Sequence, residues 1–197
     1  PYSVKKWSQS KWMNDPFGRN IWGTPPQGCA DYAFQQHIMK SLNPETGRSV
    51  VLWPHGVLFR DSEAGIRKRM IEEDYVDAVI GLGKNLFYNS SMESCLLVCR
   101  MKKPKERKGN IIFIDAKEEL RIERTNAWLE PQHIKKISDA YWKFKDAEGF
   151  TKVANNKEVL ANNGNLSIQL YVKQAANTIE HNTEELIADV KAGQKQI

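Results

Sequence analysis

The sequence lacks the features that mark several common classes of protein. Its 197 residues include three cysteines and four histidines, with no Cys-x-x-Cys pair and no spacing suited to a metal ion. Three cysteines are too few for a disulfide framework. No apolar run approaches the roughly 18 residues of a membrane-spanning helix, and no signal-peptide core follows the first lysines. We therefore expect a cytoplasmic chain without a metal, a disulfide framework or a membrane segment.

Two catalytic signatures are absent as well. Gly81, Gly83 and Lys84 lie close together but do not form the phosphate loop G-x-x-x-x-G-K-[ST], and no G-x-S-x-G elbow occurs. These absences argue against a P-loop protein and against an α/β-hydrolase. The 41% share of hydrophobic residues is ordinary for a globular protein. At this length we expect one domain with a core of its own, plus an appendage.

The three cysteines fit a buried role. Cys95 and Cys99 are four residues apart in an apolar stretch, so in a strand both side chains face the same side. Free cysteines are among the most buried residue types. We expect these two residues and Cys29 to be buried thiols.

The net charge of +5 is distributed unevenly. Six basic residues and one glutamate lie between Arg100 and Lys108. Such a turn can hold phosphate groups through its charge, but a charged run is more often a solvated turn. Both interpretations stay open.

Residues 3–31 show no sustained period of 2 or 3.6, which predicts a long structured loop. The loop contains Trp7, Trp12 and Trp22, interleaved with basic residues. This composition would suit stacking on extruded bases beside a sugar-phosphate backbone. It would equally suit aromatic side chains that attach the loop to the domain.

The next segments alternate between helix and strand. Residues 31–42 predict an amphipathic helix with Asp31 as its N-cap. The continuous apolar run at residues 49–53 predicts a strand buried on both faces, as in a parallel sheet. Residues 54–59 then form the turn at its carboxyl end, where open α/β sheets bind ligands. Residues 63–73 predict a second helix, with Arg67 among its outward residues.

The remaining pattern closes a sheet. Residues 76–82 and 95–99 predict strands, and the link between them is too short for a helical crossover, so the second strand must return antiparallel. Residues 110–114 predict a strand at the edge of the sheet. Residues 115–145 favour mainly helix, with a break at Glu130-Pro131, and residues 178–191 favour a terminal amphipathic helix that docks on its own domain or on a partner.

Three stretches stand in an order and spacing that resemble a known family. They are CADYAFQQH at residues 29–37, GRSVVLWPHGVLF at residues 47–59 and VIGLGKNLFYNSS at residues 79–91. Together with the opening Pro1-Tyr2 they resemble the modification (M) subunit of type I restriction-modification enzymes, an N6-adenine DNA methyltransferase. The resemblance covers most of the chain. One departure is Leu170, where the family commonly has arginine before Tyr-Val.

The resemblance implies an α/β fold. Residues 1–115 would form the second half of a Rossmann-like methyltransferase sheet with an antiparallel last strand, and residues 116–197 a mostly helical C-terminal appendage. Pro1-Tyr2 would end a catalytic Asn/Asp-Pro-Pro-aromatic loop, whose first half would lie upstream together with the site for S-adenosylmethionine. Residues 15–17 imitate this loop, but they lack the second proline and do not follow a strand.

The resemblance also implies roles for individual residues. Tyr2 would stack on a flipped adenine, and Pro1 would shape the loop. Phe87 or Tyr88 would cover the other side of the base, although Phe87 fits equally well as a plug at the end of the sheet. The composition of the N-terminal loop, rather than the resemblance, suggests that two lysines near its start contact the sugar-phosphate backbone; they are Lys5 and Lys6.

The partners implied are DNA, the specificity and restriction subunits of a type I complex, and the missing N-terminal half of the same subunit. We expect the chain alone to bind the methyl donor poorly and to be inactive. A non-catalytic nucleic-acid-binding module is the alternative from another class, and a methyltransferase that acts without restriction partners also stays open.

Overall fold

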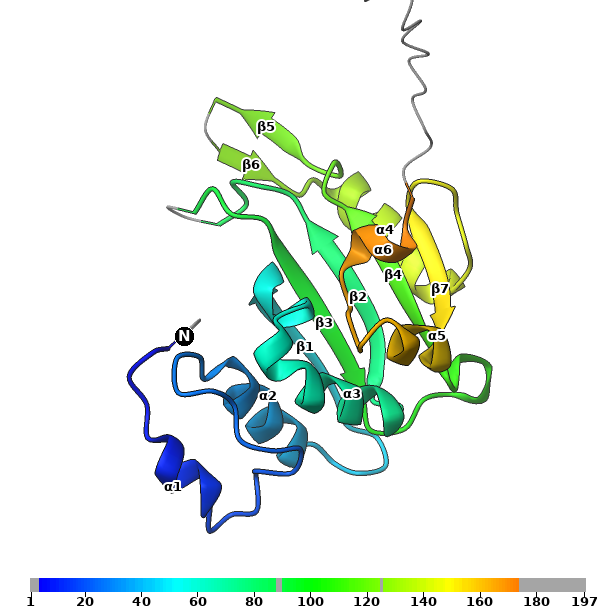
Figure 1. Cartoon of the computed structure of the whole chain (residues 1–197). Coiled ribbons are helices and arrows are strands. Elements are labelled where there is room, and N and C mark those ends of the chain that lie inside the picture. The colour runs from blue at the N-terminus through cyan, green and yellow to red at the C-terminus, as the bar shows by residue number, and fades with distance from the viewer. Residues whose placement is uncertain (1–3, 88–89, 125, 174–197) are drawn as a thin grey trace, which may run out of the picture.

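The computed structural model describes residues 4–87, 90–124 and 126–173 (Figure 1). Five strands form one sheet in the order β1-β3-β2-β4-β7, and two more form a separate hairpin. The strands are β1 (Arg48–Pro54), β2 (Val76–Leu82), β3 (Ser94–Arg100), β4 (Asn110–Ala116), β5 (Arg121–Glu123), β6 (Asn126–Trp128) and β7 (Thr151–Asn155). The helices are α1 (Gln9–Met13), α2 (Asp31–Lys40), α3 (Ala64–Glu72), α4 (Pro131–Lys143), α5 (Asn156–Ala161) and α6 (Ile168–Tyr171), with short 3-10 turns η1 (His55–Leu58), η2 (Asp61–Glu63) and η3 (Lys105–Arg107).

Strand β3 runs antiparallel between β1 and β2, as the short link between residues 82 and 94 predicts. Leu97 of β3 pairs with Val51 on one side and with Val79 on the other. Strand β4 runs parallel to β2. The strands β1, β2 and β4 therefore end at one edge of the sheet, marked by Pro54, Leu82 and Ala116, which we call the carboxyl edge.

The predicted burial of the first strand on both faces is wrong. Within the described residues β1 pairs only with β3, and that pairing is antiparallel. Its burial alternates, and the Val50 side chain is 63% exposed. The second edge of β1 meets no described strand. On that side no neighbouring strand contributes side chains that would help to cover the two faces of β1.

The predicted edge position of residues 110–114 is also wrong. Strand β4 lies inside the sheet, because β7 pairs antiparallel with it on the side away from β2. The side chains of residues 111–114 are completely buried. A strand that arrives about 40 residues later in the sequence thus completes this part of the sheet, and neighbouring sequence gave no sign of it.

Residues 115–145 are only partly helical. A hairpin of β5 and β6 replaces the predicted helix there, and Arg124 at its turn has a φ of 55°. The predicted break at Glu130-Pro131 is the start of α4. Pro131 is its first residue, and Glu130 and His133 form a reciprocal capping box.

The N-cap of α2 differs from the prediction too. Ala30 occupies that position and Asp31 is the first helical residue, with its carboxylate bound to side chains of other segments instead of to the helix end. A carboxylate in the first turn still suits the positive end of the helix dipole.

Helices cover both faces of the sheet (Figure 1). On one face, α2, α3, α5 and α6 enclose a core in which the Phe113 and Tyr171 rings stack with centroids 4.0 Å apart. Cys95 and Cys99 both face this core, as predicted, and all three cysteines are buried free thiols. On the other face, Ile137 of α4 packs on the sheet. Burying each large apolar side chain contributes roughly 1.5–3 kcal/mol.

The described residues of the predicted appendage, residues 116–197, pack closely on the described residues of the predicted methyltransferase half, residues 1–115. Strand β7 extends the sheet, and α6 contacts β2, β4 and β7. The division at residue 116 stays a prediction, and the predicted terminal helix at residues 178–191 lies outside the described residues. None of the described helices is long and apolar enough to span a membrane.

Candidate functional site

Three segments follow strands that end at the carboxyl edge of the sheet: η1 follows β1, residues 83–87 and 90–93 follow β2, and the β5–β6 hairpin follows β4. The hairpin is tied to the loop because the Ala127 amide donates to the carbonyl of Asn85 over 3.0 Å. Phe87 lies in that loop with 37% of its surface exposed, and it forms an isolated bridge with Ser90. Phe87 is thus placed at the edge where ligands of open α/β sheets bind.

The turn at residues 55–60 is held from several sides. The Val57 carbonyl accepts a hydrogen bond from the Tyr32 hydroxyl at 2.8 Å, and the Leu58 carbonyl accepts one from the Leu166 amide at 2.9 Å. The Arg60 carbonyl accepts one from the Arg67 guanidinium at 2.7 Å. Helices α2 and α3 and the segment before α6 thereby fix the chain where it leaves β1.

Arg67 itself is 1% exposed, so its predicted outward position is wrong. It is buried like Ile66 and Met70 of the same helix, and its guanidinium also donates to the carbonyl of Gly164 at 3.0 Å. Residues 63, 67 and 70 have the spacing of one helical face, which places Arg67 on the same side as the buried Met70. The prediction of an outward side chain followed from its charge alone.

A buried ionic cluster lies beside this turn, where α2 and α3 begin. The Arg60 guanidinium donates to Asp31 Oδ2 and to Glu63 Oε2, both over 2.6 Å, and the Cys29 thiol donates to Asp31 Oδ2 over 3.0 Å. Both carboxylate side chains have no exposed surface. Two carboxylates therefore share one cation, at two helix starts whose dipoles favour negative charge. Sequence analysis missed this cluster, because its members lie up to 34 positions apart.

The protonation tendencies in the cluster follow from burial. Burial raises the pKa of Glu63 although Arg60 opposes the shift, and burial raises the pKa of the Cys29 thiol to about 11. For Arg60, burial favours the neutral form, but hydrogen bonds to Glu63 and Asp31 outweigh it and raise the pKa. Glu63 Oε1 has no hydrogen-bond partner among the residues that the structure describes. Both carboxylates are shielded from solvent while the Arg60 side chain is 27% exposed, and this geometry suits a structural clamp.

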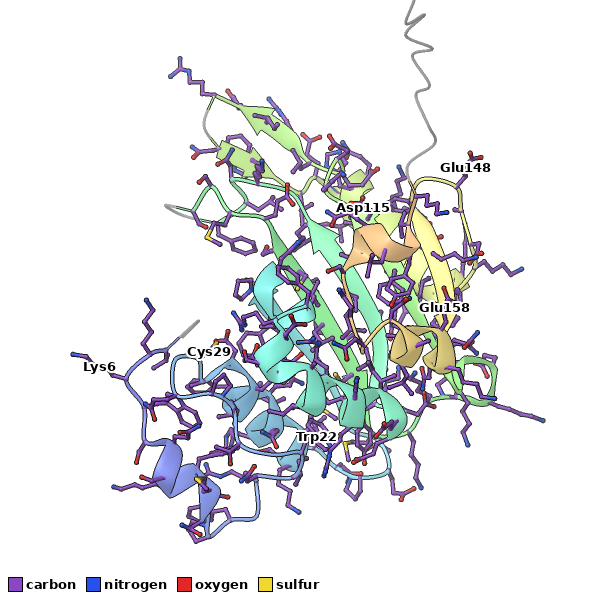
Figure 2. The ribbon with its side chains drawn as sticks, viewed as in Figure 1. Lys6, Trp22, Cys29, Asp115, Glu148 and Glu158 are labelled. Atoms are coloured by element: carbon purple, nitrogen blue, oxygen red, sulfur yellow. The ribbon has the colours of Figure 1, made fainter. Side chains whose placement is uncertain are left out.

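Sequence analysis placed Lys5 and Lys6 at the start of the N-terminal loop, and both are exposed. Figure 2 shows Lys6 pointing away from the sheet. The loop is tied down beside them, because Trp7 Nε1 donates to the Gln27 carbonyl at 2.9 Å and the Gln27 amide returns a bond at 2.8 Å.

The other two tryptophans of the loop serve packing. Trp12 is 8% exposed and Trp22 is 3% exposed, and the Trp22 ring nitrogen donates to Glu73 at 3.0 Å. Figure 2 places Trp22 among the helices below the sheet. Because both rings are buried, Trp12 and Trp22 attach the loop to the domain and are not available to stack on bases.

The basic turn divides its charge, because Lys102, Lys105 and Lys108 are exposed while the other basic side chains are paired inside the protein. Lys103 is buried, and its ammonium contacts Asp74 at 2.8 Å and the carbonyl of Asn110 at 2.6 Å. Arg107 is buried, and its Nη1 donates to Asp77 Oδ2 at 3.0 Å. Its guanidinium also lies over the rings of Tyr141 and Trp142 in α4 and of Phe144, which follows α4. Lys103 and Arg107 thus tie the turn to the sheet and to α4, and for the exposed lysines both interpretations of the turn stay predictions.

Three of the predicted site residues lie outside the described residues: Pro1, Tyr2 and Tyr88. The roles assigned to them stay predictions. The structure brings Phe87 to the carboxyl edge and leaves Lys5 and Lys6 exposed on a separate loop.

The turn after β1 does not fit a cradle for a methyl donor. Its one glycine, Gly56, is covered by Arg60, whose Nη1 would lie 2.8 Å from an added Cβ. Among the residues that the structure describes, no group of three or more His, Cys, Asp or Glu side chains could hold a metal ion. The described residues at the carboxyl edge can therefore place loops and aromatic side chains around a substrate.

Comparison with known protein families matches residues 1–180 to the N-6 DNA methylase family. The type I restriction enzyme MjaVIII methylase subunit of Methanocaldococcus jannaschii is 36% identical over 157 residues, which are 77% of this chain and 26% of that protein. The MpnII methylase subunit of Mycoplasma pneumoniae is 31% identical over 198 residues, covering 95% of this chain and 36% of that protein.

Solved structures agree with these sequence matches. The type I restriction-modification methyltransferase subunit of Streptococcus thermophilus superposes with a TM-score of 0.80 and 36% identity, over 88% of this chain and 36% of that one. The EcoKI M protein shares the fold, with a TM-score of 0.59 and 15% identity. The chain thus spans about a quarter to a third of the length of the curated relatives named above.

Proposed function

Because this chain belongs to the N-6 DNA methylase family, we propose that it forms the second half of the catalytic domain of a type I methylase subunit. The complete domain would transfer a methyl group from S-adenosylmethionine to N6 of a flipped adenine. The observation that carries the proposal is the order β1-β3-β2, with its reversed strand, in a chain that matches the family from end to end of its described residues. Phe87 at the carboxyl edge adds support.

The unpaired side of β1 suits the missing part of such a domain. A parallel strand added there would end at the carboxyl edge, and its following loop would then lead into Pro1-Tyr2. In Figure 1 the first described residues, before α1, lie on the β1 side of the sheet. The methyl donor would bind in the upstream half, since the described turn after β1 is filled by Arg60.

The chain's own residues would act on the base. Tyr2 would stack on one face of the extruded adenine, with Pro1 aiming the loop, and Phe87 or Tyr88 would cover the other face. Lys5 would contact the sugar-phosphate backbone, as would Lys6. Each stacked base is worth about 1–3 kcal/mol. Loss of Tyr2 should therefore reduce transfer by about ten- to a hundredfold.

We assign the apolar groove on the α4 face of the sheet to the upstream half as well. The groove holds about 420 Å³ between α4 and the strands β1, β3 and β2. Its apolar walls include Val50 and Trp142, which are 63% and 59% exposed. The assignment rests on the position of the groove beside β1, whose second edge meets no described strand. The specificity and restriction subunits of a type I complex, and DNA, are the further partners that the family suggests.

The test is reconstitution. The chain would be produced together with an upstream segment ending in Asn-Pro or Asp-Pro and with a specificity subunit, and methyl incorporation into target DNA would be measured. Tyr2→Ala should lower incorporation, whereas Phe17→Ala, which alters a 71% exposed aromatic in the imitation motif, should leave it unchanged. Equal behaviour of the two variants would contradict the stacking role.

A second measurement addresses the location of the donor site. Calorimetry should detect no tight binding of S-adenosylmethionine by the chain alone and clear binding by the reconstituted pair. Tight binding by the chain alone would refute the assignment. The alternative of a non-catalytic nucleic-acid-binding module gains no support from the buried Trp12 and Trp22 or from the internally paired Lys103 and Arg107. It would replace the main proposal if a reconstituted pair bound DNA and donor but transferred no methyl group.

A further inference from the structure

The groove between α4 and the sheet has an apolar floor and a cationic end. Its floor is formed by alternate residues of β1, β2 and β3, and its wall is formed by α4. The residues of the floor are Val50, Ile80, Leu82, Leu96 and Val98. Where β1 begins, the lining changes to Arg48 and Arg100. An occupant of the groove would therefore meet apolar side chains along the strands and two guanidinium groups at one end.

Arg100 is paired within the chain, whereas Arg48 is not. Arg100 Nε donates to Asp77 Oδ2 at 3.0 Å, and its Nη2 donates to the Tyr141 hydroxyl at 2.9 Å. Arg107 donates to the same oxygen of Asp77 at 3.0 Å. Arg48 is exposed and forms no ion pair with any residue that the structure describes. Two guanidinium groups thus already share the one carboxylate, and the charge of Arg48 is left unbalanced.

The register of the sheet makes this charge unfavourable in the chain alone. Arg48 stands directly opposite Arg100 across β1 and β3, and both side chains line the groove. Like charges directly opposite one another in a sheet are destabilising. Two positions along the strands, Val50 stands opposite Val98, so the apolar floor begins beside the charged pair. A carboxylate supplied from outside the chain would relieve the repulsion at this end of the groove.

We propose that an amphipathic segment of the upstream half occupies this groove, with apolar side chains on its floor and an Asp or Glu carboxylate bound to Arg48. The inference rests on the part of the proposed function that assigns the groove to the upstream half, and it adds the chemistry of the contact. The open edge of β1 favours this occupant over another subunit. A strand added at that edge would lie directly beside Arg48 and Val50, which line the groove.

DNA is a less suitable occupant. In the proposed function the extruded base enters at the carboxyl edge of the sheet. Arg48 lies at the opposite end of β1, whose seven residues span about 23 Å. DNA held at the carboxyl edge therefore lies away from Arg48, and the apolar floor offers no cation to a row of phosphate groups. A protein segment that carries both apolar side chains and a carboxylate matches the floor and the end of the groove together.

The experiment measures how fast the chain leaves its complex with the upstream half. Fluorescently labelled chain, wild type or variant, would be assembled with the upstream half and challenged with excess unlabelled chain. Arg48→Met keeps an apolar stem but removes the charge. It should speed exchange by about tenfold or more, because breaking a desolvated charge pair acts mainly on dissociation. Arg48→Lys keeps the charge and should restore most of the slow exchange.

Lys108→Met is the matched control. Lys108 is also exposed and forms no ion pair with a described residue, but it does not line the groove. This variant should exchange as slowly as wild type. Slow exchange in Arg48→Met, failure of lysine to restore it, or an equal acceleration in Lys108→Met would each overturn the inference. Weaker DNA binding by Arg48→Met, with exchange unchanged, would assign Arg48 to nucleic acid instead.

The outcomes separate this inference from the proposed function. If exchange depends on Arg48 but the wild-type assembly transfers no methyl group to target DNA, the contact stands and the proposed activity falls. If methyl transfer occurs and exchange does not depend on Arg48, the proposed activity stands and the contact falls. A wild-type chain that forms no complex with the upstream half would overturn the assignment of the groove, and this inference with it.

Discussion

Replacing Asp77 by asparagine should release α4 from the sheet. Asp77 has no exposed surface, and its Oδ2 accepts hydrogen bonds from Arg100 and Arg107, both at 3.0 Å, and from the Tyr141 hydroxyl at 2.6 Å. The Arg107 guanidinium also donates to the Tyr141 carbonyl at 2.9 Å. One carboxylate thus connects β2, β3, the basic turn and α4.

The size of the effect follows from charge. Asparagine keeps the shape of the side chain but leaves two largely buried guanidinium groups without a counter-charge. Removing one partner of a buried ion pair costs about 3–5 kcal/mol. If that loss falls on the contact between α4 and the sheet, the amide protons of α4 should exchange about a hundredfold faster or more.

Hydrogen exchange measured by mass spectrometry on the assembled subunit would test this. Asp139→Asn is the control, because Asp139 forms an exposed pair with Lys135 on α4 itself, and such pairs contribute less than about 1 kcal/mol. The Asp77 variant should lose protection over residues 131–143, and the Asp139 variant should keep it. Equal protection in both variants would refute the view that the Asp77 contacts hold α4 in place.

Three further outcomes follow from buried groups. A thiol reagent at pH 8 should label Cys29, Cys95 and Cys99 only after unfolding, because burial raises their pKa values to about 11, 12 and 12; fast labelling of any folded thiol would contradict this. Burial also raises the pKa of Glu63 above its usual 4.5, so wild-type stability should fall as pH rises from there through the folded-state pKa. The unfolding free energy of Glu63→Gln minus that of wild type should rise over the same window, and a flat difference would be inconsistent with the shift. Arg67→Met should lower the unfolding free energy by about 3 kcal/mol, measured by urea unfolding, since it strands buried carbonyl groups; a loss below about 1 kcal/mol would show that they find other partners.

The sequence allowed prediction of those parts of the fold that short-range constraints decide. The link between residues 82 and 94 is too short for a crossover helix, so the reversal of β3 could be predicted. The common orientation of Cys95 and Cys99 followed from the two-residue period of a strand. The turn after β1 was correctly expected at the end of an apolar strand.

What sequence analysis missed depends on distant neighbours. The interior position of β4 requires β7, which is polar enough to escape notice as a strand. The basic turn became a clamp because Asp74, Asp77 and the rings near Tyr141 meet it only in the folded chain. The same holds for the candidate site, where the Phe87 loop could be identified from the family pattern but the ionic cluster of Asp31, Arg60 and Glu63 could not.

The insertion of β3 between β1 and β2 also constrains the order in which the sheet can assemble during synthesis. Strands β1 and β2 each pair with β3, and not with one another. In the finished sheet they lie two strand spacings apart, about 9.5 Å, with the later strand filling the gap. A nascent chain that ends before residue 94 therefore holds two apolar strands with an open slot between them. We expect a chaperone that recognises exposed apolar strands to bind chains of this length, and to release them once β3 has entered.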